Sequence, residues 1–239
     1  MNSELGFRPL YRQVYDYLLR QISQGSWAPG EALPSEQALA RELGVSQGTI
    51  RKALDAMTAA NVIERRQGKG TFVAEQTQER ALYRFFRLAH PNGMRAIPQC
   101  GEEHVSRRAA SLREREKLGL NEEQDVIEIL RTRLIEARPS VFETIVLPAH
   151  LFPDIEEHAP LPNALYSVYQ SGFGVNIVTT EEEIKADLAR SEDARRLKLS
   201  EGAPILHIER VAIGMDGASV EWRISRCDTQ HVAYAVTLR

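Results

Sequence analysis

The sequence has little of what secreted, membrane-spanning or zinc-stabilised proteins need. Its 239 residues include two cysteines, Cys100 and Cys227, which lie far apart and outside any CxxC or Cys/His cluster. We therefore predict neither a disulfide framework nor a zinc site. No apolar run approaches the roughly 20 residues that cross a bilayer, and the first residues, MNSELGFRPLYRQ, lack the basic and apolar regions of a signal peptide. We expect a cytoplasmic protein with no membrane partner.

An excess of charge of one sign is also missing. The net charge of −3 argues against a protein that coats nucleic acid over its whole surface. The local distribution is uneven, because residues 1–80 hold 10 Lys/Arg against 9 Asp/Glu, and residues 81–239 hold 20 against 24. Residues 47–73 contain five basic residues and only two acidic ones. A short basic patch therefore lies on a slightly acidic protein that is long enough for two ordinary domains.

The first part of the chain has the pattern of short, capped helices. Apolar residues recur at every fourth position between Pro9 and Gly25, which predicts an amphipathic helix: Leu10, Val14, Leu18 and Ile22. A second helix is predicted over 36–43, where Ser35 serves as the N-cap and Gly44 ends the helix.

A third helix and a hairpin follow. The helix is predicted to begin after Ser46 and to fade near Asn61. Residues 62–66 and 71–73 are strand-like, and the glycines of segment 67–70 suit a tight turn. Because the link between the second and third helices is too short for an antiparallel pair, these elements predict a winged helix-turn-helix.

The rest of the chain is predicted to be an α+β domain with an antiparallel sheet. We place a DNA-binding domain at 1–74, a polar linker at 75–82 and a second domain at 83–239. Charged segments 111–119 and 191–199 are the predicted helices. The predicted strands are 125–135, 140–147, 174–186, 204–213, 219–227 and 232–238.

The second domain contains an internal sequence repeat, an echo of its first half at an offset of 79 residues. It pairs Leu118 with Leu197, and the ungapped match continues through Arg131 with Arg210 to Val141. A twofold-repeated domain has a crease between its halves that would suit a ligand. A chance match between two helix-plus-hairpin units is the alternative.

Polar and basic side chains at the start of the third helix are the candidates for DNA contact. Base edges are read by polar groups near the N-terminus of a recognition helix, and phosphates attract Lys and Arg. A solvated charged face of a protein-interaction domain is the alternative. The candidates are Ser46, Gln47 and Thr49 for bases, Arg51 for guanine or phosphate, Lys52 for phosphate, and Gly68 and Lys69 at the hairpin tip for the backbone or minor groove.

Both parts of the chain resemble a known family. The stretch LPSEQALARELGVSQGTIRKALDAMTAANVIERRQGKGTFV closely resembles the N-terminal domain of the GntR family of bacterial transcription regulators. The segments IEILRTRLIEARPSVFETIVLP, LYSVYQSGFGV and SVEWRISRCDT look like the UTRA effector-binding domain of the HutC subfamily. The resemblance implies a winged helix joined to a chorismate-lyase-like domain. It further implies a homodimer on a twofold-symmetric operator, working as a repressor that a small metabolite releases.

The resemblance also marks two departures in the DNA-binding domain. Thr49, Arg51 and Gly68 match positions that contact DNA in the family, but Gln37 and Gln47 stand where the family commonly has arginine. Loss of two cations weakens phosphate and guanine contacts, and glutamine pairs best with adenine. We therefore expect a shifted operator preference.

Two arginines in the second domain are candidates for an anion site. Alternation along strand 125–135 places Arg131 and Arg133 on one face among isoleucines. Buried guanidinium groups need anionic partners, either a ligand carboxylate or phosphate or a residue of the protein. If residues 137–139 turn the chain, Arg133 falls near Glu143 across the hairpin, so an internal ion pair is the alternative. The resemblance favours a small anionic effector and implies a wider set of contacts: Arg131, Arg133, Glu143, Ser167, Tyr169 and Glu221. Family members that bind sugar phosphates often have a tyrosine late in the chain, and this sequence has Arg226 or Cys227 at that position. An organic acid is therefore as good a candidate for the effector as an amino-sugar phosphate.

A regulator has two rival functions. One is an enzyme, because the second domain resembles a lyase fold, but fold does not carry activity. No histidine lies in a nucleophile or metal motif and no glycine-rich phosphate loop follows a strand, so we predict no catalytic residues, no metal and no cofactor. The other rival is a DNA-binding protein whose second domain only dimerises.

Overall fold

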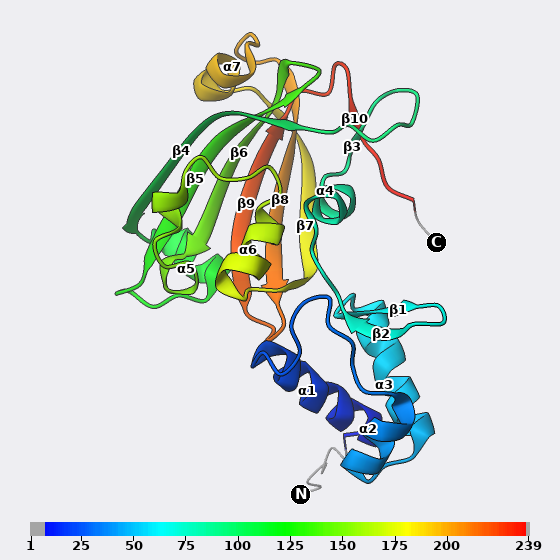
Figure 1. The fold of residues 1–239 in the computed structure, drawn as a ribbon. Coiled ribbons are helices and arrows are strands. Elements are labelled where there is room, and N and C mark those ends of the chain that lie inside the picture. The colour runs from blue at the N-terminus through cyan, green and yellow to red at the C-terminus, as the bar shows by residue number, and fades with distance from the viewer. Residues whose placement is uncertain (1–7, 238–239) are drawn as a thin grey trace, which may run out of the picture. The chain divides into compact units, whose positions relative to one another are not determined.

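The chain divides after Glu75 into two compact units. The computed structural model describes residues 8–237, and Figure 1 shows both units as ribbons. No helix among the residues it describes has the length and apolarity to cross a bilayer.

The N-terminal unit is the predicted winged helix-turn-helix. Its elements are α1 (Leu10–Ser23), α2 (Glu36–Leu43), α3 (Gln47–Ala59), β1 (Ile63–Arg66) and β2 (Gly70–Val73). The Ser35 hydroxyl accepts from the Ala38 amide and the Ser46 hydroxyl from the Thr49 amide, while Gly44 ends α2 in the left-handed region. These caps satisfy amides that the first turn of a helix leaves unpaired, and they fix the sharp turn between α2 and α3.

The segment expected as a linker contains the start of a helix. Helix α4 (Gln78–Phe85) begins after Thr77, whose hydroxyl accepts from the Arg80 amide. One residue earlier, the Gln76 amide donates to the Gln170 side chain at 2.7 Å, so the second unit begins at Gln76. Ala81 and Phe85 are buried in its core. The sequence prediction missed this helix because its apolar residues, Ala81, Leu82 and Phe85 among them, come only after a polar run.

The C-terminal unit is built on one six-stranded antiparallel sheet, as predicted, with strand order β4-β5-β6-β9-β8-β7. The strands are β4 (Gln99–Ala109), β5 (Asp125–Ile135), β6 (Arg138–Pro148), β7 (Ile177–Leu188), β8 (Pro204–Gly214) and β9 (Ser219–Cys227). Strand β4 was not predicted. The expected strand 232–238 is reduced to β10 (Ala233–Tyr234), which pairs with β3 (Leu88–Ala89) in a small separate sheet.

Helices cover both faces of the large sheet (Figure 1). The face that we call the inner face packs against α4, α6 (Leu165–Phe173) and the short helices η1 (Ala149–Leu151) and η2 (Ile155–His158). Helices α5 (Leu112–Leu118) and α7 (Ser191–Leu197) lie on the other face, the outer face. Helix α6 was missed by the sequence prediction, because it is apolar on several sides instead of striped.

The internal echo is a structural repeat. Moving β5 and α5 along by 79 residues gives the bounds of β8 and α7, and β4 falls on β7 within one residue. The strand order is correspondingly symmetric about the β6–β9 pair. After the hairpin, the structural offset between the two halves is one residue larger than the offset of the ungapped sequence match. Arg131 lies opposite Glu143, whereas its repeat partner Arg210 lies opposite Arg223. The second hairpin holds one more residue than the first.

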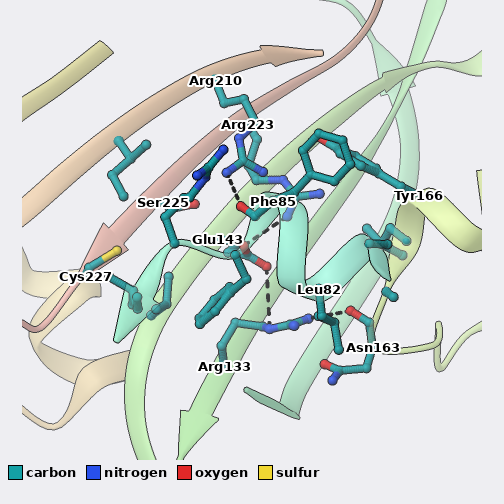
Figure 2. Close-up of a pocket in the computed structure, with 18 of the residues that line it drawn as sticks. Leu82, Phe85, Arg133, Glu143, Asn163, Tyr166, Arg210, Arg223, Ser225 and Cys227 are labelled. Carbon is teal, nitrogen blue, oxygen red and sulfur yellow. Dashed lines mark hydrogen bonds and ion pairs between the residues drawn. The ribbon is translucent and has the colours of Figure 1, made fainter. Parts of the chain in front are cut away.

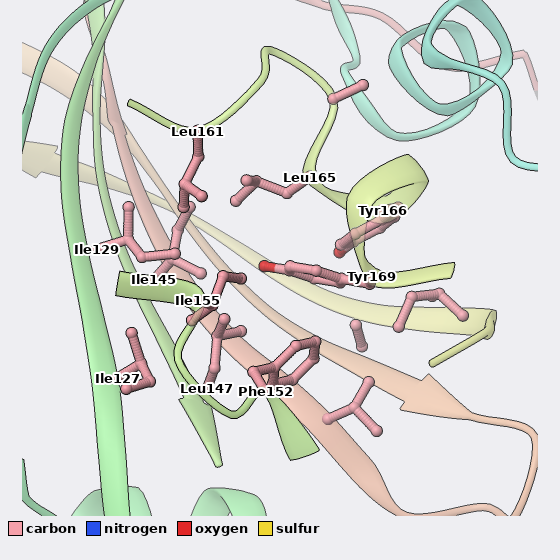
Figure 3. Close-up of a cluster of buried hydrophobic side chains, with 14 of the residues drawn as sticks. Ile127, Ile129, Ile145, Leu147, Phe152, Ile155, Leu161, Leu165, Tyr166 and Tyr169 are labelled. Atoms are coloured by element: carbon pink, nitrogen blue, oxygen red, sulfur yellow. The ribbon is translucent and has the colours of Figure 1, made fainter. Parts of the chain in front are cut away.

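The main core of this unit lies on the inner face of the sheet. Ile127, Ile129 and Ile145 point from the strands toward Phe152 and Tyr169, and all five are fully buried. Figure 3 shows the rings of Tyr166 and Tyr169 on α6 and of Phe152, the residue after η1, beside this isoleucine layer. This packing fixes the position of α6. The tyrosine hydroxyls of α6 are thereby held next to the arginines described below.

One capped helix yields a stability prediction. Burial alone would raise the pKa of Glu114, but hydrogen bonds from Arg108 and Ser111 outweigh it and lower the pKa to about 2. The folded-state pKa of Glu114 lies below its ordinary value of 4.5. The ionised carboxylate therefore stabilises the fold fully above pH 4.5, and this stabilisation is lost as the pH falls toward 2. Glu114→Gln is expected to reduce the free energy of unfolding at pH 7 by about 1–3 kcal/mol. Urea unfolding at pH 7, 5 and 3 measures this, and an unchanged pH dependence in the variant would contradict it.

Candidate DNA-binding surface and ligand cavity

The Glu36 carboxylate on α2 joins the recognition helix α3 to α2 and β1. Its Oε2 atom accepts from Arg51 Nη2 at 2.9 Å and from Gln47 Nε2 at 3.3 Å, and its Oε1 atom accepts from Arg65 Nη2 at 3.4 Å. The hydrogen bond from Arg51 lowers the pKa of Glu36. Helix α2, helix α3 and strand β1 are thereby connected, and the side chains of Arg51 and Gln47 are held in place at the start of α3.

The predicted DNA-contact residues form an accessible set. Thr49 is half-buried with its hydroxyl 2.8 Å from that of Ser46, so both are partly engaged in capping. Lys52 Nζ lies 4.4 Å above the Tyr11 ring, a cation–π contact that still leaves the side chain exposed. The remaining members are also exposed: Gln37, Gln47, Arg51, Gly68 and Lys69.

The β1–β2 hairpin projects a small basic tip. Gly68 and Gly70 have φ of 70° and 120°, values that side chains rarely adopt, so glycine is required for this turn. At its base, Arg66 lies over the Phe72 ring at 4.2 Å and pairs with Glu64. These contacts stiffen the hairpin and leave Lys69 at its exposed end.

The C-terminal unit contains a cavity, partly open to solvent, on the inner face of the sheet. Apolar walls come from α4, from the start of α6 and from strands β6 and β8. Figure 2 shows guanidinium groups pointing into it from several strands. Among its lining residues are Leu82, Phe85, Phe86, Leu88, Arg131, Arg133, Val141, Glu143, Asn163, Leu165, Tyr166, Ile208, Arg210, Arg223, Ser225, Cys227 and Tyr234.

Two of the arginines are committed to carboxylates. Arg223 donates to Glu221 at 3.0 and 2.8 Å and to Glu143 at 3.1 Å. Arg210 Nε donates to Glu182 at 2.6 Å, and its Nη2 donates to the Phe85 carbonyl at the end of α4. The charges of these two arginines are therefore largely balanced from within the protein.

The other two arginines are incompletely satisfied. Arg131 is 2% exposed, and its Nε donates to Glu143 at 2.9 Å, but its Nη1 has no hydrogen-bond partner among the described residues. Arg133 is 1% exposed. Its Nη1 donates to the Asn163 carbonyl at 3.0 Å, while its Nε is likewise unpaired and 3.9 Å from Glu143.

The charge state of this cluster follows from its surroundings. Burial, and next the charge of Arg131, lower the pKa of Arg133 to about 10, so Arg133 is still protonated at neutral pH. Burial would raise the pKa of Glu143, but Arg223 and Arg131 outweigh it and keep this carboxyl ionised. Glu143 lies within ion-pair distance of three guanidinium groups, while Glu221 also pairs with Arg223 and Glu103 lies 4.0 Å from Arg131 Nη1. What an anion can complete is therefore the hydrogen bonding of Arg131 Nη1 and Arg133 Nε, which no described residue satisfies.

Three predicted effector contacts do not line the cavity. Glu221 is completely buried behind it and accepts from Tyr166 and Tyr169 at 2.8 Å each. Tyr169 packs in the core against Phe152. Ser167 contributes its carbonyl to the Ser171 hydroxyl within α6. Helix α6 therefore presents Tyr166 to the cavity, three positions before Tyr169 and one before Ser167.

Sequence reasoning missed several lining residues. Arg210 had a signal, because it is the repeat partner of Arg131. Arg223 lies opposite Arg210 in the β8–β9 pair, the position that Glu143 occupies opposite Arg131. Asn163 comes from a connection without periodicity, so no pattern indicated it. Of the two residues considered for the late tyrosine position, Cys227 lines the cavity, whereas Arg226 binds Asp187 and Asp193 on the outer face.

Metal chemistry has no site in the described part of the chain, where no group of three or more His, Cys, Asp or Glu residues could hold an ion.

Comparisons with known proteins match both units. Residues 10–73 match the model of bacterial regulatory proteins of the gntR family, and residues 100–233 match the UTRA domain. The chain is 30% identical over 97% of both chains to the mannosyl-D-glycerate transport/metabolism system repressor MngR of Escherichia coli. It is 32% identical to the histidine utilization repressor of Pseudomonas putida, over 86% of this chain and 82% of that one.

Solved structures show the same fold. The ligand-binding domain described as that of a GntR-family transcriptional regulator from Bordetella bronchiseptica aligns with a TM-score of 0.58 and 27% identity, over 66% of this chain and 99% of that one. PhnF from Mycobacterium smegmatis aligns with a TM-score of 0.56 and 21% identity, over 94% and 99%. These families and relatives are transcriptional regulators and not enzymes. The chain belongs to the GntR family of bacterial DNA-binding regulators, with a UTRA domain of the kind found in HutC-type repressors.

Proposed function

We propose that this protein is a cytoplasmic, homodimeric repressor that leaves a twofold-symmetric operator when a small organic anion binds in the arginine-lined cavity. The observation that carries the proposal is the pair of buried guanidinium groups, Arg131 and Arg133, each with an unpaired N–H group. Buried donors without partners are costly, so a site that retains them gains free energy when an anion completes their hydrogen bonds.

The walls of the cavity favour an anion with an apolar body. Leu82, Phe85 and Ile208 line it together with other apolar side chains. The polar groups of Tyr166 and Asn163 are already used in hydrogen bonds to Glu221, Pro98 and Arg133. Few groups remain to receive the hydroxyls of a sugar. The names of relatives point to different metabolites, mannosyl-D-glycerate and histidine among them, so we base the ligand class on the cavity.

Helix α4 is the element through which the ligand would act. It begins three residues after the DNA-binding unit ends, and Leu82 and Phe85 on it line the cavity. A ligand that favours one placement of α4 biases the spacing of the two recognition helices, which a B-DNA operator requires to be about 34–36 Å. A coupling of about 1–3 kcal/mol changes operator affinity by roughly 5–150-fold, enough to relieve repression.

The proposal is tested by capturing genomic fragments with the purified protein and measuring binding to the best fragment by fluorescence anisotropy. We expect a near-palindromic site with a steep dependence on salt, and release by apolar carboxylates before sugar phosphates. Normal operator binding with no response to any metabolite pool would favour a second domain that only dimerises. Failure to enrich any sequence would overturn the regulator function itself.

The two glutamines predict an altered operator sequence. Gln47 lies exposed at the start of α3, where its amide is oriented by Glu36. Because glutamine pairs with adenine and arginine with guanine, Gln47→Arg is expected to shift the selected base from adenine toward guanine by about 1–3 kcal/mol at one position per half-site. Selection from a random DNA library with both proteins measures this. If the wild-type protein and Gln47→Arg select the same sites, Gln47 does not contact a base.

A further inference from the structure

The small sheet of β3 and β10 supplies a second apolar cover on the inner face of the large sheet. Leu88 of β3 and Val232, which precedes β10, belong to one buried cluster with Val141 of β6 and Ile208 of β8. Leu88, Val141 and Ile208 also line the cavity. The cavity therefore lies between this second cluster and the main core, and residues near the C-terminal end of the chain belong to its surroundings.

The register of the large sheet separates the charged part of the cavity from its apolar part. Arg133 of β5 lies opposite Val141 of β6, and Val141 lies opposite Cys227 of β9. Residues that lie opposite each other share a face, and a buried thiol behaves as a small apolar group. This row of side chains therefore begins with a guanidinium group and continues with apolar side chains.

The neighbouring row has the same direction. It begins with Arg131 and Glu143 and ends with Ser225 and Ile208. Strand β8, which carries Ile208, is three strand spacings from β5. At about 4.8 Å per spacing, Ile208 lies roughly 14 Å across the sheet from the strand that carries both arginines.

Tyr234 of β10 closes the cavity beside this apolar part. Its ring packs against the second cluster and lines the cavity. Its hydroxyl donates to Glu182 of β7, the strand next to β8, and Glu182 also accepts from Arg210 at 2.6 Å. These contacts hold the ring of Tyr234 on the side of the cavity that is remote from Arg133.

The charges of the cavity suit a ligand with one anionic group. Arg210 and Arg223 are already bound by carboxylates of the protein. Among the described residues that line the cavity, the buried N–H groups without partners belong to Arg131 and Arg133. A second charge on the ligand would lie among the apolar side chains, where burial of an unpaired charge is costly.

We propose that the effector is a straight-chain monocarboxylate whose chain lies along Val141 and Ile208, and that Tyr234 sets the longest chain that fits. This rests on the anion site of the proposed function and names the class of ligand that the site takes. The carboxylate completes the hydrogen bonds of Arg131 and Arg133, while the chain removes apolar wall from water. A slender chain, unlike a ring system, can follow a row of side chains across several strands.

The first test is titration calorimetry of the full chain with straight-chain carboxylates from acetate to decanoate, below the concentration at which micelles form. We expect the affinity to rise by roughly fourfold with each methylene up to a limiting length, and to fall beyond it. An affinity that does not depend on chain length overturns the inference. Binding of sugar phosphates but of no carboxylate also overturns it and leaves the anion site standing, whereas binding of neither class overturns both.

The second test locates the limit at Tyr234. In Tyr234→Ala, the first chain that is too long for the wild type is expected to bind roughly 5–150-fold more tightly, because the overpacking is relieved. Tyr234→Leu, which keeps an apolar side chain against the second cluster, should shift the limit in the same direction by less. The matched control is Val236→Ala, a valine 52% exposed two residues further along the chain, which should leave the limit unchanged. A limit that is the same in all four proteins overturns the role of Tyr234.

Discussion

Arg133→Met is expected to abolish the response to the anion while leaving operator binding and folding intact. Arg133 is buried, has an unpaired Nε, and lies 3.9 Å from the nearest Glu143 oxygen. Its lowered pKa means that the folded protein disfavours its charge. Methionine fills similar space without that cost, whereas the anion loses hydrogen bonds to a charged donor, each worth about 1.5–3 kcal/mol. We expect ligand affinity to fall by roughly 10–150-fold per lost bond, measured by calorimetry, and the Tm to stay constant or rise.

Arg131→Met is the matched comparison. Arg131 also faces the cavity, but it forms a 2.9 Å ion pair with Glu143, so its removal leaves a buried carboxylate with one hydrogen-bonded partner fewer. This variant should lose both ligand affinity and stability. If Arg133→Met unfolds as readily as Arg131→Met, Arg133 has a structural role instead. If Arg133→Met still leaves the operator at the wild-type ligand concentration, the anion binds elsewhere.

The sequence predicted the DNA-binding unit almost completely, because its structure is determined locally. Caps at Ser35 and Ser46, the left-handed Gly44 and the hairpin glycine Gly68 each act within a few residues of their place in the chain. Periodicity and capping rules apply at that range. The sheet strands were found for the same reason, since alternation is also local. Strand β4 and helix α6 escaped because neither has a clear amphipathic pattern.

The cavity was predicted only in part, because its chemistry is decided between distant strands. The prediction that Arg131 and Arg133 share a strand face is confirmed, but their partners depend on register. The sequence suggested Glu143 opposite Arg133, whereas the structure places it opposite Arg131, with Val141 opposite Arg133. The balance between an internal ion pair and a ligand site could not be resolved without Arg223, which shares Glu143 from 80 residues away. No local pattern carries that contact.

Glu221→Gln is expected to destabilise the C-terminal unit strongly. The carboxylate is fully buried and accepts four hydrogen bonds, from Tyr166, Tyr169 and twice from Arg223. Burial, and then the charge of Glu221, raise the pKa of both tyrosines, so both remain donors at neutral pH. Removing one partner of a buried ion pair costs about 3–5 kcal/mol, which for a unit of this size lowers the Tm by roughly 6–20 °C. Thermal unfolding measures this.

Two further variants decide what Glu221 does. Glu181→Gln, exposed on β7, should leave the Tm unchanged. Adding Arg223→Met to Glu221→Gln should recover part of the loss, because removing both partners of a buried pair costs less than removing one. A Glu221→Gln protein with wild-type Tm but weakened anion binding would mean that Glu221 contacts the ligand directly, as the family resemblance implies. The expected result instead makes Glu221 the group that orients Tyr166 and Arg223 at the cavity wall, so its effect on ligand binding would follow from the loss of that wall.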